Sequence, residues 1–199
     1  ELETFSDDCA SEVHLLEEYC EVVYQCSVEQ KNLKAERKKL DALIERVKSL
    51  VEKKDTFYLA IFMPYKASMW DSLESIWKAA RADKKFRCVV MPIPYYEYNS
   101  EKKELVYCYE GDKLPEGIPI IDFHEIDLER EHPDVIYIHN PYDDANFVTS
   151  VPEKYFSREL KKYTDKLVYV PYYVKYGAIS ETHRRLPVCY HMDYMIAQS

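Results

Sequence analysis

The sequence predicts an α/β fold, in which a Rossmann-like, doubly wound and mostly parallel sheet follows an N-terminal helical segment. Residues 57–199 alternate short apolar runs with amphipathic stretches, the pattern of strands joined by right-handed helical crossovers. Residues 1–56 contain neither proline nor glycine, so no residue interrupts a helix there. We therefore divide the chain into a helical segment, 1–56, and a Rossmann-like domain, 57–199.

Composition and charge exclude several classes of protein. The net charge of −9 argues against a general nucleic-acid binder, which needs a basic face, so we expect no nucleic-acid partner. No apolar run approaches the ~20 residues that cross a bilayer, and the acidic N-terminus lacks the apolar core of a signal peptide. All three glycines follow residue 110, which excludes a glycine-rich phosphate loop after the first strand.

The cysteines and histidines show no metal-binding pattern. The six cysteines form no CxxC pair, and the six histidines have no ligand spacing with acids or thiols. This usage is typical of reduced thiols in a cytoplasmic protein. We therefore expect no disulfide, no metal and no cofactor.

Within residues 1–56, apolar side chains recur in two rows with a spacing of seven residues. The members of the rows are Tyr19, Cys26, Leu33, Leu40 and Val47, and Leu15, Val22, Leu43 and Leu50. Glu29 and Glu36 interrupt the second row, so the pattern fits either one long helix or a helical hairpin that bends near residues 26–32. The expected role is a stalk or a dimerising coiled coil. The basic cluster at residues 31–39 suggests the alternative of contact with anionic lipid.

From residue 57 the expected elements follow one another closely. Residues 57–64 form an apolar run typical of a strand buried on both faces. Ser68 is the expected N-cap of a helix over 69–83, whose apolar face holds Trp70, Leu73, Ile76, Trp77 and Ala80. Further strands are expected at 86–93, 104–111, 118–123, 134–140, 167–174 and 193–199. Short helices are expected at 125–131 and 157–166.

Four expected strands end in a proline that is closely followed by tyrosine. These ends are MPYKAS (63–68), MPIPYYEYN (91–99), HNPYDDANF (139–147) and VPYYVKYG (170–177). Proline stops the ladder of hydrogen bonds, and tyrosine adds a flat apolar ring with a hydroxyl. Because ligands of such sheets bind beyond the carboxyl ends of the strands, we expect the four turns to wall one cleft.

The polar residues of these turns are the candidate site. His139 is a candidate general base, with Asp143 and Asp144 steadying its ring or binding substrate hydroxyls. The alternatives are that His139 pairs with the backbone and that the two acids cap the next helical turn. Lys66 and Ser68, near a helix N-terminus, could hold a phosphate oxygen. The other polar residues expected at this edge are Glu97, Asn99, Asn140 and Lys175.

Residues 57–199 resemble the N-terminal half of CDP-glycerol glycerophosphotransferases of the teichoic-acid polymerase type. The resemblance lies in MPYKASMWDSLESIWKAA, in MPIPYYEYN, in the segment from YEGDKLPEG to LVYVPYYV, and in DYMIAQS. Its most specific part is the run IYIHNPYDDANFVTSV at residues 136–151. The helical segment 1–56 has no counterpart in this resemblance.

The resemblance implies a glycosyltransferase-B architecture, with two Rossmann-like domains facing one cleft. Residues 57–199 would be the acceptor side, and the C-terminal domain that binds CDP-glycerol would be absent from this chain. In the implied reaction of cell-wall polymer synthesis, a hydroxyl of a (poly)glycerophosphate or lipid-linked acceptor attacks the β-phosphate of CDP-glycerol and releases CMP. We take His139 and Asp143 as the catalytic candidates. The candidates for substrate contact are Lys66, Ser68, Tyr65, Asn140, Tyr142 and Asp144.

These implications set the remaining expectations. The partners would be CDP-glycerol and the polymer acceptor, with a homodimer formed through residues 1–56. The location would be the cytoplasm, with peripheral contact to the inner face of the membrane, and the chain alone would be inactive. One alternative is a non-catalytic Rossmann-like scaffold with a dimerising coiled coil. The other is a nucleotide-sugar glycosyltransferase of the same architecture.

Overall fold

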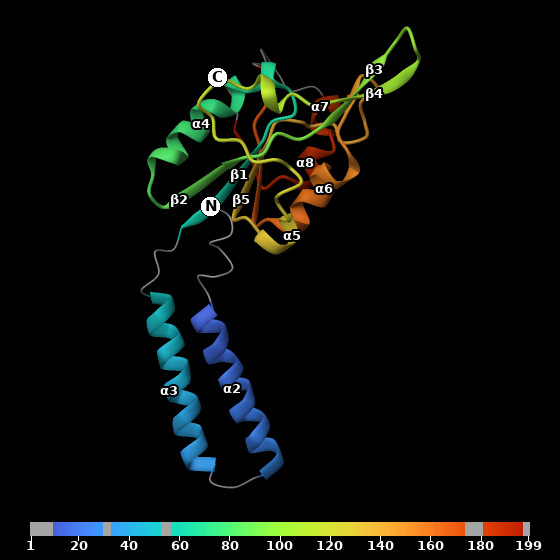
Figure 1. The fold of residues 1–199 in the computed structure, drawn as a ribbon. Coiled ribbons are helices and arrows are strands. Elements are labelled where there is room, and N and C mark those ends of the chain that lie inside the picture. Colours follow the sequence, from blue (N-terminus) through green and yellow to red (C-terminus); the bar gives the residue numbers. More distant parts are fainter. Residues whose placement is uncertain (1–9, 30–32, 53–56, 174–180, 197–199) are drawn as a thin grey trace. The chain divides into compact units, whose positions relative to one another are not determined.

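The computed structural model describes residues 10–29, 33–52, 57–173 and 181–196. The chain divides into two compact units, residues 1–56 and residues 57–199. The first is a pair of helices and the second is an α/β domain with a mostly parallel sheet (Figure 1). The predicted fold class is confirmed at this level, and the topology of the sheet is compatible with a Rossmann-like domain.

The first unit is a helical hairpin. Helices α2 (Ala10–Glu29) and α3 (Leu33–Glu52) lie side by side, and Lys39 of α3 is 3.2 Å from the carboxylate of Glu18 in α2 (Figure 1). Their shared core consists of residues from the two predicted apolar rows: Leu15, Val22 and Leu43, with Tyr19, Cys26, Leu40, Val47 and Leu50 packed against them. The hairpin alternative is therefore confirmed, and one continuous helix is wrong.

The second unit is built on a five-stranded parallel sheet with strand order β2-β1-β5-β7-β8. The strands are β1 (Tyr58–Met63), β2 (Phe86–Val90), β5 (Val135–Ile138), β7 (Lys166–Tyr169) and β8 (Tyr194–Met195). Met63 pairs with Ile138, and Ile138 pairs with Tyr169, so these carboxyl ends lie at one edge. This edge receives the turns that were predicted to form a site.

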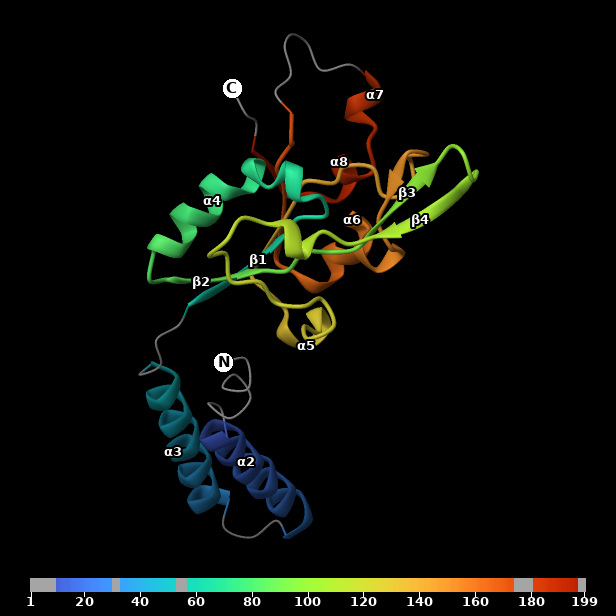
Figure 2. The ribbon, with the colours of Figure 1, turned by 45° about the horizontal axis from the view of Figure 1, so that its top comes forward.

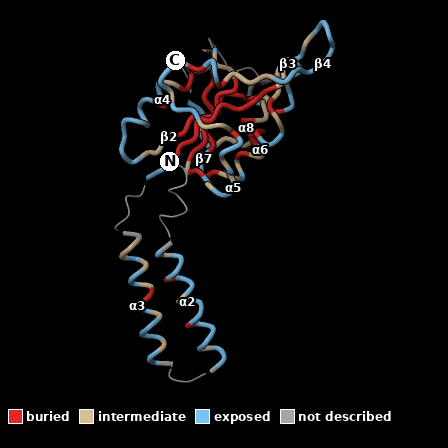
Figure 3. The backbone as a smooth tube through the Cα atoms, in the orientation of Figure 1, coloured by how far each residue is buried: buried red, intermediate tan, exposed pale blue. Residues whose placement is uncertain are grey.

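Successive side chains of β1 point to opposite faces of the sheet, and each face has its own helices. Ala60 and Phe62 pack with Trp70, Leu73 and Trp77, because α4 (Asp71–Ala82) covers that face. The other face carries three short helices, α5 (Leu128–Glu131), α6 (Ser157–Leu160) and α8 (Val188–His191). Figure 2 shows α4 apart from α6 and α8, and Figure 3 shows the buried strands between these layers.

A smaller antiparallel sheet of order β4-β3-β6 follows the carboxyl end of β2. It consists of β3 (Tyr95–Asn99), β4 (Glu104–Cys108) and β6 (Thr149–Ser150). The strand predicted over 118–123 is reduced to one bridge between Val90 and Ile120. Pro119 precedes that bridge and has no N–H to extend a ladder. Strand β6 has only two residues and was not predicted.

Several predicted helix boundaries are wrong. Ser68 is not the N-cap of α4, because it lies inside a 3-10 turn, η1 (Ala67–Met69), that leads directly into the helix. The amide of Trp70 donates to the carbonyl of Ala67, so the turn itself supplies an acceptor at this end. The helix expected over 157–166 is split into α6 and a 3-10 turn, η4 (Lys161–Tyr163). The remaining short elements are η2 (Gly111–Lys113), η3 (Glu153–Tyr155) and α7 (Glu181–Arg184).

Two buried tyrosines test how hydrogen bonding of a buried hydroxyl affects the stability of the core. The hydroxyl of Tyr155 is buried and has no hydrogen-bond partner among the described residues, whereas that of Tyr95 donates to Glu110 at 2.9 Å. We expect Tyr155→Phe to raise the free energy of unfolding by about 1 kcal/mol, because a buried unpaired hydroxyl is lost. Tyr95→Phe should lower it by about 2 kcal/mol, because the Glu110 carboxylate loses a donor. Urea unfolding of both variants is the measurement, and equal destabilisation would contradict the assignment.

Candidate functional site

The four Pro–Tyr turns meet at the carboxyl edge of the parallel sheet. The rings of Tyr65 and Tyr95 lie edge to face with centroids 5.5 Å apart. The ring of His139 lies 5.0 Å from Tyr65 and 6.2 Å from Tyr172, and the hydroxyls of Tyr172 and Tyr142 are 3.2 Å apart. Each turn contributes at least one ring to this aromatic cluster. The four turns therefore share one edge, as predicted, whereas the cleft that they were expected to wall stays a prediction.

His139 lies at the centre of the aromatic cluster and is completely buried. Its Nε2 accepts the backbone N–H of Tyr65 at 3.1 Å, so the ring proton is on Nδ1. Nδ1 bonds to the carbonyl of Met69 and lies 3.4 Å from the hydroxyl of Ser72. Burial lowers the pKa of His139 to about 3, against the smaller opposing effect of the Met69 carbonyl. The imidazole is therefore neutral at pH 7.

This geometry matches the alternative in which His139 pairs with the backbone. Both ring nitrogens are engaged, and no part of the ring is exposed to an incoming hydroxyl. A catalytic role of His139 stays a prediction that the geometry does not support. The residue instead ties the turn after β1 and the start of α4 to the end of β5.

Asp143 does not steady the imidazole, and this expectation is wrong. Its two carboxylate oxygens accept the amide and the hydroxyl of Ser157 at 2.8 and 2.7 Å. Burial raises the pKa of Asp143, although the Ser157 hydrogen bonds act in the opposite direction. Because Ser157 is the first residue of α6, Asp143 caps α6, which matches the alternative expectation for Asp143 only and at a later turn than the next one in the chain. Asp144 is exposed and lies 3.8 Å from Arg158.

A polar network borders the aromatic cluster. The Lys66 ammonium is 2.8 Å from the Glu97 carboxylate and 4.9 Å from the centre of the Tyr95 ring. The Glu110 carboxylate accepts the Tyr95 hydroxyl at 2.9 Å and the Ala67 amide at 2.8 Å. Burial by itself raises the pKa of Glu110, but these two hydrogen bonds and a nearby lysine outweigh burial, so the pKa is lowered. Glu110 is therefore ionised and fixes the turn that carries Lys66.

Of the remaining predicted site residues, some lie near this network and others lie elsewhere. Ser68 is exposed on the same turn as Lys66, and Asn140 accepts the amide of Tyr142 at 3.3 Å. Asn99 does not belong to the site, because its side chain accepts two amides in the β3–β4 turn. Lys175 lies outside the described residues. Glu110 was not among the predicted site residues, because its contact with Ala67 spans 43 positions of the sequence.

The edge offers groups that bind hydroxyls. The side chain of Glu97 is 45% exposed and that of Lys66 is 18% exposed, so a ligand can reach one acceptor and one donor side by side. Burial raises the pKa of Tyr65 to about 12, and the pKa of Tyr172 is also raised by burial, so both hydroxyls remain protonated donors at pH 7. Within the described ranges, no group of three or more His, Cys, Asp or Glu side chains could hold a metal ion. Among these residues, no helix combines the length and apolarity needed to cross a membrane.

Comparison of the chain with models of protein families, with curated proteins and with solved structures finds no match in any of the three. The family resemblance of residues 57–199 therefore remains a hypothesis based on sequence motifs.

The burial of His139 predicts a pH dependence of stability. Its ordinary pKa is about 6.5, so below that pH the unfolded chain binds a proton that the folded chain does not. Stability present above pH 6.5 is lost as the pH falls toward 3, at up to ~1.4 kcal/mol per pH unit. We expect His139→Gln to reduce the slope of the unfolding free energy against pH by the contribution of one proton, because glutamine does not titrate in that range. Glutamine can still accept a hydrogen bond from the Tyr65 amide. Urea unfolding from pH 7 to 4 is the measurement.

The control is His14→Gln, which alters an exposed histidine of α2, in the other unit of the chain. This variant should keep the pH slope of the parent protein between pH 6 and 4. An unchanged slope in His139→Gln would mean that the imidazole is protonated in the folded state.

Proposed function

We propose that residues 57–199 are the acceptor-side domain of a glycosyltransferase-B-type enzyme. The enzyme transfers glycerol phosphate from CDP-glycerol to a hydroxyl of a (poly)glycerophosphate or lipid-linked acceptor. The observation that carries the proposal is the convergence of four Pro–Tyr turns and the Lys66–Glu97 pair at one carboxyl edge of a parallel sheet, the usual ligand position in such sheets. The choice of this family rests on the resemblance of the motifs at residues 63–80 and 136–151.

Lys66 and Glu97 are the proposed acceptor contacts. A glycerol hydroxyl that accepts from the Lys66 ammonium can donate to the Glu97 carboxylate, since the two groups are 2.8 Å apart. In the reaction the hydroxyl oxygen bonds to the β-phosphorus of CDP-glycerol, the bond from that phosphorus to the CMP oxygen breaks, and Glu97 takes the hydroxyl proton. The donor and the groups that hold its phosphates would come from a second domain. A nucleotide-sugar donor would need the same acceptor edge.

His139 acts in this proposal as a positioning residue. It accepts a hydrogen bond from the backbone amide of Tyr65, the neighbour of Lys66. Glu110 fixes the same turn from the other side, because it accepts the amide of Ala67. The aromatic rings that surround His139 exclude water from these bonds. Loss of either hydrogen bond would displace the Lys66 ammonium from Glu97.

The acceptor role is tested first by binding. The 199-residue chain should bind an oligomer of glycerol phosphate, and Lys66→Gln should weaken this binding roughly threefold to tenfold, because a charge-assisted contact is lost. Isothermal titration calorimetry is the measurement. Lys162→Gln is the control, because Lys162 forms an equivalent pair with Glu159 on the surface. The acceptor assignment fails if CDP-glycerol binds more tightly than the oligomer.

The catalytic role of Glu97 is tested by transfer of glycerol phosphate in the enzyme that joins this domain to a donor domain. Glu97→Gln should lower kcat about 10²-fold to 10⁴-fold, because the amide cannot accept the hydroxyl proton. Glu101→Gln, at the exposed tip of the β3–β4 hairpin, should leave kcat unchanged. Full activity of Glu97→Gln would assign proton removal to another group.

A second function, a dimerising scaffold, is favoured by the surface of the hairpin. Helix α2 buries one apolar row against α3 but exposes a second row on another face. The exposed row contains Val13, Leu16, Cys20 and Val23, at spacings of three and four residues. A stripe with this spacing fits the apolar stripe of a second helix, so we propose that two copies of the chain associate through α2.

Sedimentation of the chain measures this association. Leu16→Lys should convert a dimer to a monomer, because it places a charge in the centre of the apolar row. The control Glu17→Lys changes an exposed neighbour outside the row and should leave the dimer intact. A parent chain that is monomeric at all concentrations would remove the scaffold function without affecting the acceptor role.

A further inference from the structure

A hollow of about 470 Å³ lies on the α5 and α6 face of the sheet. It is bounded by the segment 123–130 and by η3 and η4, and its lining combines apolar and charged side chains. The apolar residues that line it are Met91, Phe123, Ile126, Leu128 and Tyr155. Met91 of the lining follows the carboxyl end of β2, but neither Lys66 nor Glu97 lines the hollow, so it is distinct from the Lys66–Glu97 pair. Nothing in the proposed transfer reaction uses it.

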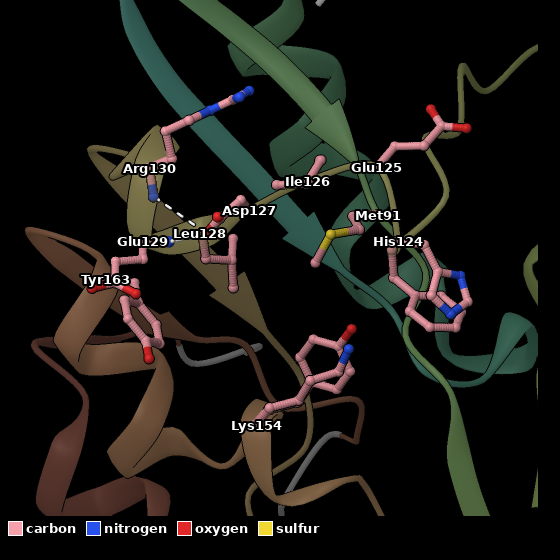
Figure 4. A pocket seen from close by; sticks show the side chains of 12 residues that line it. Met91, His124, Glu125, Ile126, Asp127, Leu128, Glu129, Arg130, Lys154 and Tyr163 are labelled. Atoms are coloured by element: carbon pink, nitrogen blue, oxygen red, sulfur yellow. Dashed lines mark hydrogen bonds between the residues drawn. The ribbon is translucent and has the colours of Figure 1, made fainter.

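One side of the hollow carries an available cation. The ammonium of Lys154 lies 5.3 Å from the centre of the Phe123 ring and 4.8 Å from that of Tyr155. In the part of the chain that the structure describes, no carboxylate pairs with Lys154. Arg130 also lines the hollow, but its guanidinium bonds to Glu131 at 2.7 Å and points away (Figure 4). Lys154 is therefore the positive group that a ligand would meet.

The other side carries an available anion. Glu129 lies beside Tyr163 and apart from Lys154 (Figure 4), and no cation pairs with it within the described ranges. The two other acids of the hollow are occupied or turned away. Asp127 accepts the amides of Glu129 and Arg130 in α5, and the carboxylate of Glu125 points outward (Figure 4). Glu129 is therefore the negative group that a ligand would meet.

We propose that this hollow binds a small zwitterion with an apolar spacer between its charges. The anionic group of the ligand pairs with Lys154, its ammonium group pairs with Glu129, and a flat apolar body packs against the apolar part of the lining, which includes Phe123 and Leu128. A simple anion would leave Glu129 unpaired, and a simple cation would be repelled by Lys154. The charge distribution of the hollow thus selects for both ends of the ligand.

The probe for this site is 4-(aminomethyl)benzoate, with benzoate and benzylamine as its two halves. Titrations of the 199-residue chain, followed by calorimetry and by NMR shifts of residues 123–130, measure the three affinities. We expect the zwitterion to bind roughly twofold to fivefold more tightly than either half, because each partly exposed ion pair adds a modest free energy. Equal affinity for the zwitterion and one half would overturn the proposal, as would the absence of binding.

Two variants assign the ends of the ligand. Lys154→Gln should weaken the binding of the zwitterion and of benzoate but not that of benzylamine. Glu129→Gln should weaken the binding of the zwitterion and of benzylamine but not that of benzoate. Both residues are exposed, so the variants should retain the fold, which circular dichroism checks. The controls are Lys162→Gln, outside the hollow, and Glu125→Gln, whose carboxylate points outward. If either control changes the affinity as much as its counterpart, the assignment of the two ends is wrong.

Discussion

A neutral imidazole joins three segments of the chain at the carboxyl edge of the parallel sheet. His139 directly follows β5, accepts the amide of Tyr65 after β1, and bonds to the carbonyl of Met69 in η1, which leads into α4. Without this acceptor the Tyr65 amide would be buried and unpaired, which costs about 1–3 kcal/mol. Because the ring reaches the ends of two neighbouring strands and the helix between β1 and β2, it sets the relative positions of the turns around the candidate site.

The order of the elements could be predicted from the sequence because it depends on local patterns. Apolar runs marked β1 and β2, and repeated Pro–Tyr pairs marked the edge where the turns meet. The partners of single side chains could not be predicted, because they come from distant positions. Asp143 bonds to Ser157, and Glu110 bonds to Ala67, which no spacing in the sequence indicates. The burial of His139 likewise depends on rings from other turns.

The helical hairpin illustrates a limit of periodic patterns. The spacing of seven residues identified the side chains of the core, but it could not decide whether they face another chain or the other half of the same chain. Residues 1–56 contain no proline or glycine that would have indicated two separate helices. Helix α2 has apolar residues on two faces, so one face can serve the hairpin and the other a second copy, which separates folding from association.

The β3–β4 hairpin extends from the site, and only its base, at Tyr95 and Cys108, packs against the main core. Its turn is held by Asn99, which accepts the amides of Glu101 and Lys102, and its side chains there are exposed. Strand β3 begins at Tyr95, whose ring lies under the Lys66 ammonium. A fluorophore attached at the turn would thus be connected to the site by one continuous strand while leaving every residue of the edge chemically intact. The hairpin offers a natural place from which to observe ligand binding optically.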